Sequence, residues 1–251
     1  MRYLIPFSYM IKTRYSTFFY KIAFVLVYFL PIIIVCRFFY ADLLSVAVSL
    51  IGINCLYEEG YLDNDLITSK YEINPTVRLQ EKERQYFEKN YIILKAGRIS
   101  LFLIIVLVYT ITDINSAKIM LTGGVALIIS YALHNTIRSR KNIITFTFLV
   151  TLKYLLPVLC GRMEVSEIQS AFSALFFVIC IPRIFEYSLK YTEKYRSLLN
   201  KKKIMRIIYY LFIVFLTGIK FLLTKKVEPI FLLSIYYFIF RVIDIIRTVR
   251  R

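Results

Sequence analysis

The stretch ADLLSVAVSLIGINCLYEEGYLDND, residues 41–65, joins an apolar helix directly to a run of acidic side chains. Carboxylates follow the apolar part at intervals of seven residues, at Glu58, Asp65 and Glu72, and Tyr61 lies between the first two. Seven residues are about two turns of an α-helix, so these side chains are predicted to share one face. Because neighbouring carboxylates repel one another unless a cation or a polar ligand lies between them, this face is the first candidate site.

The rest of the chain is apolar enough to place that helix in a membrane. Of 251 residues, 59% are hydrophobic, and the mean hydropathy is +0.64. Several windows of about 18 residues carry almost no charge, which is typical of transmembrane helices. Eight spans are predicted, at residues 22–40, 41–57, 92–112, 117–135, 143–160, 166–185, 205–223 and 229–246.

These spans predict an all-α, polytopic membrane bundle of about eight transmembrane helices. Two long connections follow the second and the sixth span, which divides the bundle into four-helix halves at residues 22–135 and 143–248. Residues 1–21 mix four basic side chains with aromatic ones and are predicted to form an interfacial arm on the cytoplasmic side.

The distribution of charge excludes one class of partner and favours another. The chain has a formal net charge of +17, but its basic residues lie between hydrophobic spans. Anionic lipid headgroups or phosphorylated substrates are therefore better partners than nucleic acid. Lys and Arg are concentrated in alternate connections, which predicts a multi-pass membrane protein with both termini in the cytoplasm. The abundance of Ile, Lys and Tyr suits an AT-rich microbial genome, so the membrane is predicted to be a microbial cell membrane.

The second span is followed by the stretch Asn64-Asp65-Leu66-Ile67-Thr68-Ser69-Lys70-Tyr71-Glu72. This stretch resembles a motif of the UbiA superfamily of intramembrane prenyltransferases, whose members carry Asn-Asp-x-x-Asp-x-x-x-Asp after the second helix. The following residues 74–79, Asn-Pro-Thr-Val-Arg-Leu, are similar to the family's Asn-x-x-x-Arg-Pro-Leu. The resemblance covers all eight spans, without the family's usual ninth helix.

The resemblance implies an enzyme that moves a prenyl group from a polyprenyl diphosphate to a polar or aromatic acceptor at the cytoplasmic face. It also implies Mg²⁺ as cofactor, because the family's acidic motifs hold magnesium ions that bridge the diphosphate. Magnesium prefers oxygen ligands, so Asp65 and Glu72 are its expected ligands together with Asn64. Glu58 and Tyr61 complete the predicted catalytic set, Tyr61 by flanking a prenyl carbocation.

Basic residues are expected to bind the remaining phosphate oxygens. The set consists of Arg78, Arg138, Arg183, Lys190 and Lys153. Lys153 stands out because it is about eleven residues into the fifth span, near the bilayer centre. A charge at that depth costs at least about 2.5 kcal/mol, so Lys153 should face the bundle interior and have a partner there. Either a substrate phosphate or a carboxylate such as Glu58 fits that role, and so does a purely structural ion pair.

Departures from the family motif keep other functions open. In the first motif, Thr68 replaces an aspartate of the family. The family has a second, Asp-rich motif after its sixth helix; here that stretch reads Glu186-Tyr187-Ser188-Leu189-Lys190, with Lys190 in place of an aspartate. A lysine binds phosphate without a metal, so transfer of a phosphoribosyl or other sugar phosphate onto a polyprenyl phosphate is a close alternative. The other alternative functions are a lipid transporter and a non-catalytic scaffold. The row of Glu58, Asp65 and Glu72 can also be only a solvated helix face.

Overall fold

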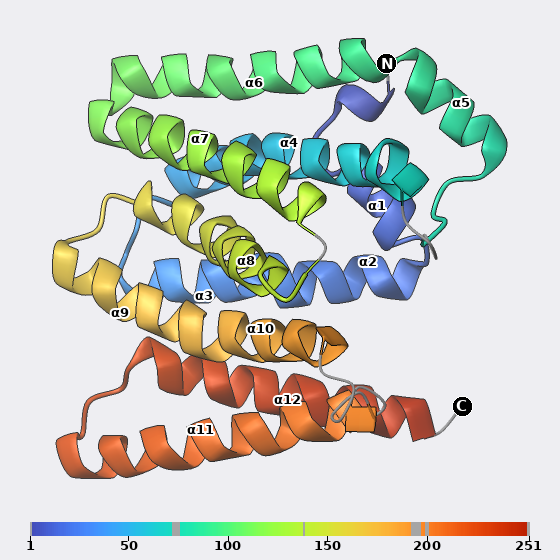
Figure 1. Ribbon diagram of the computed structural model, residues 1–251. Helices are drawn as coiled ribbons and strands as arrows, with labels where there is room; N and C mark the ends of the chain where they lie inside the picture. Colours follow the sequence, from blue (N-terminus) through green and yellow to red (C-terminus); the bar gives the residue numbers. More distant parts are fainter. Residues whose placement is uncertain (1, 72–75, 138, 192–196, 199–200, 250–251) are drawn as a thin grey trace. The chain divides into compact units, whose positions relative to one another are not determined.

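The computed structural model describes residues 2–71, 76–137, 139–191, 197–198 and 201–249. Every regular element within these ranges is helical (Figure 1). Eight helices are long and apolar enough to cross a membrane: 18–38, 43–71, 91–112, 114–136, 142–159, 165–191, 202–224 and 229–247. Each matches one predicted span to within a few residues at most ends, which confirms the all-α polytopic fold and makes the chain a multi-pass membrane protein.

The largest difference from the prediction is at the end of the second span. The apolar run 41–57 continues without interruption as α4 (Leu43–Leu66) and a 3₁₀ turn (Thr68–Tyr71). Glu58 and Asp65 therefore belong to the same helix as the apolar segment. Asp42 caps its first turn by accepting hydrogen bonds from the backbone N–H groups of Leu44 and Ser45, the usual role of an N-cap aspartate.

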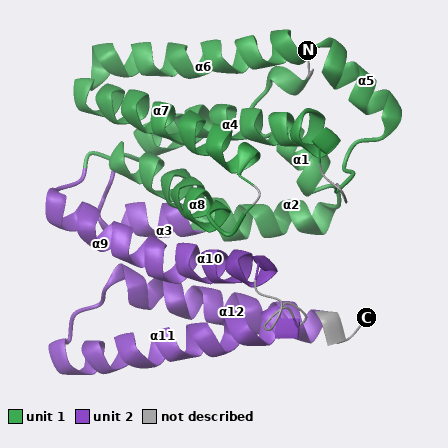
Figure 2. Ribbon diagram, viewed as in Figure 1, with its two compact units in different colours: residues 1–30, 42–162 green, residues 31–41, 163–251 purple. Residues whose placement is uncertain are grey.

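The chain forms two compact units, residues 1–30 with 42–162 and residues 31–41 with 163–251 (Figure 2). Unit 1 contains α1 (Ser8–Arg14), α2 (Phe18–Phe24), α4, α5 (Glu81–Lys89), α6 (Tyr91–Thr112), α7 (Ile114–Thr136) and α8 (Asn142–Leu159). Unit 2 contains most of α3 (Leu30–Phe38), then α9 (Val165–Leu175), α10 (Ile181–Ser188), α11 (Lys202–Thr224) and α12 (Pro229–Val249). The unit boundary does not follow the predicted halves, because α8 packs with α4 and α7.

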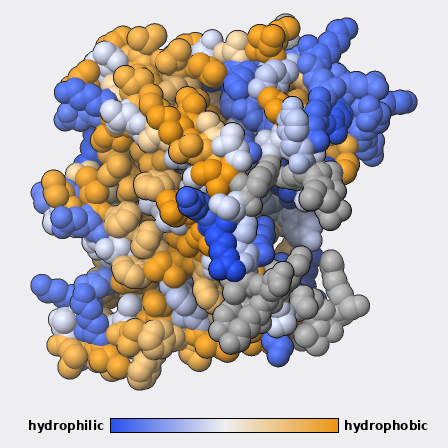
Figure 3. Space-filling model, viewed as in Figure 1, coloured by the Kyte–Doolittle hydropathy of each residue, from blue (hydrophilic) through white to orange (hydrophobic). Residues whose placement is uncertain are grey.

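Helix α4 is the centre of unit 1. It packs against α6, α7 and α8, and most of its side chains from Gly52 to Leu66 are buried. Gly60 allows a close approach, because a Cβ atom there would overlap the ring of Tyr131 on α7. Apolar side chains cover α6 and α7 on the outside, and hydrophilic ones gather at the end that carries α5 (Figure 3). The polar end of α4 is thus held in a rigid helical frame.

The N-terminal residues, which were predicted to form an interfacial arm, pack against the rest of unit 1. Helix α1 packs against α4, and Tyr9 and Met10 are completely buried. Both donate hydrogen bonds to carboxylates of α4, Tyr9 to Asp65 and Met10 through its backbone N–H to Glu58. The acids of α4 therefore provide the polar partners that draw this segment into unit 1.

Unit 2 is built on two helical pairs. α11 packs along α12, and α12 also packs against α9. Helix α11 is apolar, yet Tyr210 is its one buried residue, which is the pattern of a helix that faces lipid. A π-helical segment, Phe176–Cys180, joins α9 to α10.

Candidate functional site

The last turns of α4 bury three carboxylates. Glu58 is fully buried, and Glu59 and Asp65 are 6% and 7% exposed. A solvated helix face, one of the readings open from the sequence, is therefore excluded for these positions. Glu72, the third residue of the predicted acidic row, lies outside the described residues, so its pairing with Asp65 stays a prediction.

Asp65 is surrounded by donors. Arg14 Nη1 is 2.7 Å from its Oδ2 and Arg14 Nη2 is 3.1 Å from its Oδ1, a bidentate fork that is among the stronger ion pairs. Arg78 Nη1 is 2.9 Å from Oδ1 and the Tyr9 hydroxyl is 2.8 Å from Oδ2. Burial, and then the charge of Asp65, raise the pKa of Tyr9, so its hydroxyl stays protonated and remains a donor. Asn64 adds a long amide contact of 3.4 Å to Oδ1.

Glu58 and Glu59 share a second cation, Arg98 of α6. Its Nη1 donates to Glu59 Oε1 at 3.0 Å, and its Nη2 lies 3.8 Å from Glu58 Oε2. Nη2 also donates to the carbonyl of Tyr3 at 2.8 Å, which ties the N-terminal residues to α6. Arg98 is fully buried, and reasoning from the sequence missed it. The signal was present, because a charged residue inside an apolar span marks an interior position.

Lys153 faces the interior of unit 1, as predicted for a charge in the middle of a span. It is 4% exposed, and its Nζ lies 4.2 Å from the ring centroid of Tyr57 and 4.4 Å from that of Tyr28. The sulfur of Met10 is 4.0 Å away. Aromatic faces stabilise a desolvated ammonium group through cation–π attraction. The predicted role of Lys153 in binding phosphate stays a prediction.

Tyr61 contacts the same network from the side. The guanidinium carbon of Arg14 is 3.9 Å from its ring centroid, and its ring also meets those of Tyr57 and Tyr131 edge to face. Tyr61 therefore packs against Arg14, the arginine that binds Asp65. Its predicted role beside a carbocation stays a prediction.

The surroundings of Asp65 bear on the predicted magnesium ion. Both oxygens of Asp65 already accept hydrogen bonds from arginines. Within the described ranges, no group of three or more His, Cys, Asp or Glu side chains is placed to bind a metal. Because Glu72 is outside those ranges, the magnesium prediction stays a prediction, and the chemistry below is argued without it.

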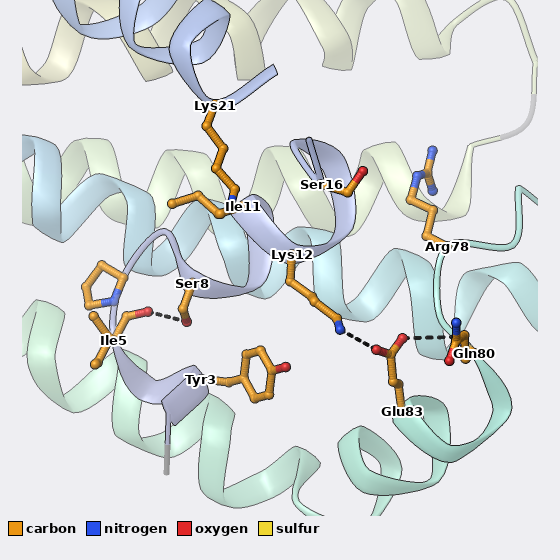
Figure 4. A pocket seen from close by; sticks show the side chains of 11 residues that line it. Tyr3, Ile5, Ser8, Ile11, Lys12, Ser16, Lys21, Arg78, Gln80 and Glu83 are labelled. Atoms are coloured by element: carbon orange, nitrogen blue, oxygen red, sulfur yellow. Dashed lines mark hydrogen bonds and ion pairs between the residues drawn. The ribbon is translucent and has the colours of Figure 1, made fainter. Parts of the chain in front are cut away.

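A pocket of about 630 Å³ adjoins this network, between the N-terminal residues and the segment that leads into α5. Three cationic side chains line it, Lys12, Lys21 and Arg78, together with one carboxylate, Glu83. Figure 4 shows Lys12 reaching Glu83, with which it forms an ion pair at 2.5 Å. The remaining lining is hydroxyl, amide, aromatic or apolar: Tyr3, Ile5, Pro6, Ser8, Ile11, Ser16 and Gln80.

Arg78 is the residue that joins the pocket to the buried acids. It lines the pocket, and its Nη1 donates to Asp65. Its side chain is 29% exposed, whereas that of Asp65 is 3% exposed. The buried carboxylate thus orients a guanidinium group that an incoming anion can still reach.

Two of the other predicted phosphate-binding residues belong to unit 2. These are Arg183 and Lys190, and the ammonium of Lys190 lies 4.9 Å from the ring centroid of Tyr187. Arg138 lies outside the described residues.

A comparison of the chain with protein-family models, with curated proteins and with solved structures gave no match.

Proposed function

We propose that this chain is a membrane transferase that binds the phosphate end of a polyprenyl lipid at the C-terminal end of α4. One observation carries the proposal. Arg78 is held by the buried carboxylate of Asp65 and at the same time lines a pocket with two lysines and one carboxylate. An excess of cationic groups in a partly enclosed pocket favours a phosphorylated ligand.

The pocket supplies both parts that such a ligand needs. Lys12, Lys21 and Arg78 offer ammonium and guanidinium donors for phosphate oxygens, and charge-assisted hydrogen bonds of this kind are the stronger ones in proteins. Ile5 and Ile11 supply apolar surface in the same lining, against which the first isoprenoid unit would pack. Asp65 acts as a positioning residue, because it holds Arg78 and Arg14 rather than meeting the ligand itself.

Two reactions fit this arrangement. In prenyl transfer, the bond between the prenyl carbon and the diphosphate oxygen breaks, the acceptor takes the prenyl group, and Arg78 and the lysines stabilise the negative charge on the departing diphosphate. In sugar-phosphate transfer, an oxygen of a polyprenyl phosphate attacks the sugar carbon of a donor activated as a diphosphate. The bond from that carbon to the donor's diphosphate breaks, the diphosphate leaves, and the same cations orient the attacking phosphate. The magnesium ion implied by the resemblance would assist the first reaction by neutralising the diphosphate.

A specific observation favours the second reaction as a candidate. Asp65 accepts hydrogen bonds from Arg14, Arg78 and Tyr9, so this position carries positive charge that a phosphate could meet without a metal ion. A monophosphate needs fewer compensating charges than a diphosphate. The membership in the UbiA superfamily, the identity of the acceptor and the cytoplasmic placement of this end of α4 are parts of the same proposal.

Thermal stability with added ligand tests the proposal. The purified protein would be melted with a short-chain polyprenyl diphosphate or monophosphate, each with and without magnesium. A ligand that binds only the folded protein raises its apparent stability, by about 2.7 kcal/mol at a hundredfold excess over Kd. A response to the diphosphate that requires magnesium supports prenyl transfer, and a metal-independent response to the monophosphate supports sugar-phosphate transfer.

Asp65→Asn is the informative variant and Asp63→Asn its matched control. Asp63 lies on the same helix two residues away, but it pairs with Lys95 at 3.0 Å and with Tyr91. Asp65→Asn should weaken the ligand-dependent shift, because Arg78 loses its anchor, and Asp63→Asn should leave that shift unchanged. No shift with either lipid would refute the proposal and leave a scaffold or a transporter.

A further inference from the structure

Glu58, Glu59 and Arg98 form a buried charge network in the interior of unit 1. The two acids are neighbours on α4, and Arg98 belongs to α6. Arg98 Nη1 is 3.0 Å from Glu59 Oε1, and Arg98 Nη2 is 3.8 Å from Glu58 Oε2. Glu58 and Arg98 are fully buried, and Glu59 is 6% exposed. We call Glu58 and Glu59 the glutamate pair.

This network contains two acids and one base. Arginine stays protonated in proteins, so Arg98 contributes one positive charge, whereas two ionised glutamates would contribute two negative charges. An uncompensated charge away from water costs far more than a buried neutral group, and a buried carboxylate takes up a proton instead. The charges of the network therefore balance when one of the two acids is neutral.

The hydrogen bonds of the glutamate pair leave an oxygen free on each acid. Glu58 Oε1 accepts the backbone N–H of Met10 at 2.7 Å, and Glu59 Oε1 accepts from Arg98. The Oε2 atoms of both glutamates are buried and have no hydrogen-bond partner among the described residues. Buried carboxylate oxygens are usually supplied with donors, so two without donors indicate that the pair is not fully ionised.

Other titratable groups on the surrounding helices are placed elsewhere. They are Tyr9 and Arg14 on α1, Lys95 on α6, Tyr131 and His134 on α7, and Lys153 on α8. Tyr9 and Arg14 donate to Asp65, and Lys95 pairs with Asp63. The ring of Tyr131 lies against that of Tyr57, and His134 is 3.0 Å from the hydroxyl of Thr145. The ammonium of Lys153 lies against the rings of Tyr57 and Tyr28.

We infer that the glutamate pair is a binding site for one proton at neutral pH. The proton comes from water and forms an O–H bond with one carboxylate oxygen, and Arg98 balances the negative charge of the other acid. Because both acids meet the same guanidinium group, the proton belongs to the pair rather than to one residue. Neither acid lines the pocket of unit 1, so the inference is independent of the proposed function.

The bound proton stabilises the seat of the N-terminal residues. Glu58 accepts the N–H of Met10, and Arg98 donates to the carbonyl of Tyr3. Tyr3 and Ile11 line the pocket, so the network lies behind one wall of that pocket. Loss of the proton would place a second negative charge there, and water would have to enter between α1 and α4 to stabilise it.

Infrared spectroscopy of the full chain at neutral pH, in a detergent without ester groups, tests the inference. A protonated carboxyl group has a C=O stretching band that an ionised carboxylate lacks, and the band shifts when the protein is transferred to D₂O. The unaltered protein should show this band. Glu58→Gln and Glu59→Gln should each remove it, because the one acid that remains is balanced by Arg98.

Asp63→Asn is the matched control, since Asp63 lies on the same helix and pairs with Lys95 at 3.0 Å; this variant should keep the band. Glutamine has the shape of a protonated glutamate and still accepts the N–H of Met10, so Glu58→Gln should fold and keep its N-terminal residues resistant to protease. Absence of the band from the unaltered protein, or a band of the same intensity in both glutamine variants, would overturn the inference.

Discussion

Replacing Arg98 by methionine removes the cation that forms ion pairs with two buried acids, Glu58 and Glu59. Arg98 is fully buried, Glu58 is fully buried and Glu59 is 6% exposed. The Oε2 atoms of both glutamates already lack a hydrogen-bond partner within the described part of the chain. Methionine keeps the length and apolar stem of the side chain, so the change isolates the loss of the guanidinium group.

The expected loss is large. Removing one partner of a buried ion pair costs about 3–5 kcal/mol, because an uncompensated charge remains. For a chain of this size, 1 kcal/mol corresponds to about 2–4 °C in the melting midpoint, so Arg98→Met should lower it by roughly 10 °C. The hydrogen bond from Arg98 to the carbonyl of Tyr3 is lost as well, and the N-terminal residues should become more accessible to protease.

The assay is thermal unfolding of the purified protein in one detergent. Arg84→Met is the matched control, because Arg84 pairs with Glu88 on the exposed face of α5 at 3.4 Å, and such pairs contribute about 0.5 kcal/mol. Adding Glu58→Gln and Glu59→Gln to Arg98→Met should restore much of the stability, since none of the three charged groups of this buried network remains. A fall of less than about 2 °C for Arg98→Met would refute the reasoning, because it would mean that the glutamates are neutral or hydrated.

Two further predictions concern packing and pH. Gly60→Ala should destabilise by about 1–3 kcal/mol, because the new Cβ would overlap the ring of Tyr131. Gly218→Ala, where the nearest atom would be 3.8 Å away, should be neutral or stabilising, and thermal melts of the two variants compare them directly. Hydrogen bonds from the Ser116 hydroxyl, and then from backbone N–H groups and an arginine, hold the pKa of Asp113 below its ordinary value. The stability from this N-cap is present above the unfolded pKa of about 3.9 and is lost as pH falls through the lower folded pKa. The melting midpoint should therefore fall when the pH is lowered below about 4. Asp113→Asn should reduce this pH dependence of the midpoint while still capping α7. The same pH dependence in both proteins would contradict the role given to Asp113.

The spans could be predicted from the sequence because the apolar interior of a membrane requires each spanning segment to be a long, apolar helix. Long and largely apolar windows such as residues 92–112 leave few alternatives. The acidic row was also visible, because its spacing of seven places Glu58 and Asp65 on one face. What these acids bind was not visible. Arg14 is 51 residues from Asp65, and no local pattern predicts that the N-terminal residues fold back onto α4.

One feature that the sequence reasoning missed could have been found by the criterion that identified Lys153. A charge inside a span needs an interior partner. Arg98 satisfies the same criterion, and it is central to the network of Glu58 and Glu59. The pocket itself could not be predicted, because it is lined by residues of the N-terminal segment and of the segment 78–83, which only tertiary packing brings together.

Direct binding of a short-chain polyprenyl phosphate tests the central claim most simply, measured as a dissociation constant for the unaltered protein and for Arg78→Gln. A hydrogen bond to a charged group contributes about 1.5–3 kcal/mol, so Arg78→Gln should weaken binding by roughly 10- to 100-fold. Arg84→Gln, which alters an arginine of α5 outside the pocket lining, should leave the constant unchanged. Equal affinity for all three proteins, or no binding by any of them, would contradict a phosphate site at the polar end of α4.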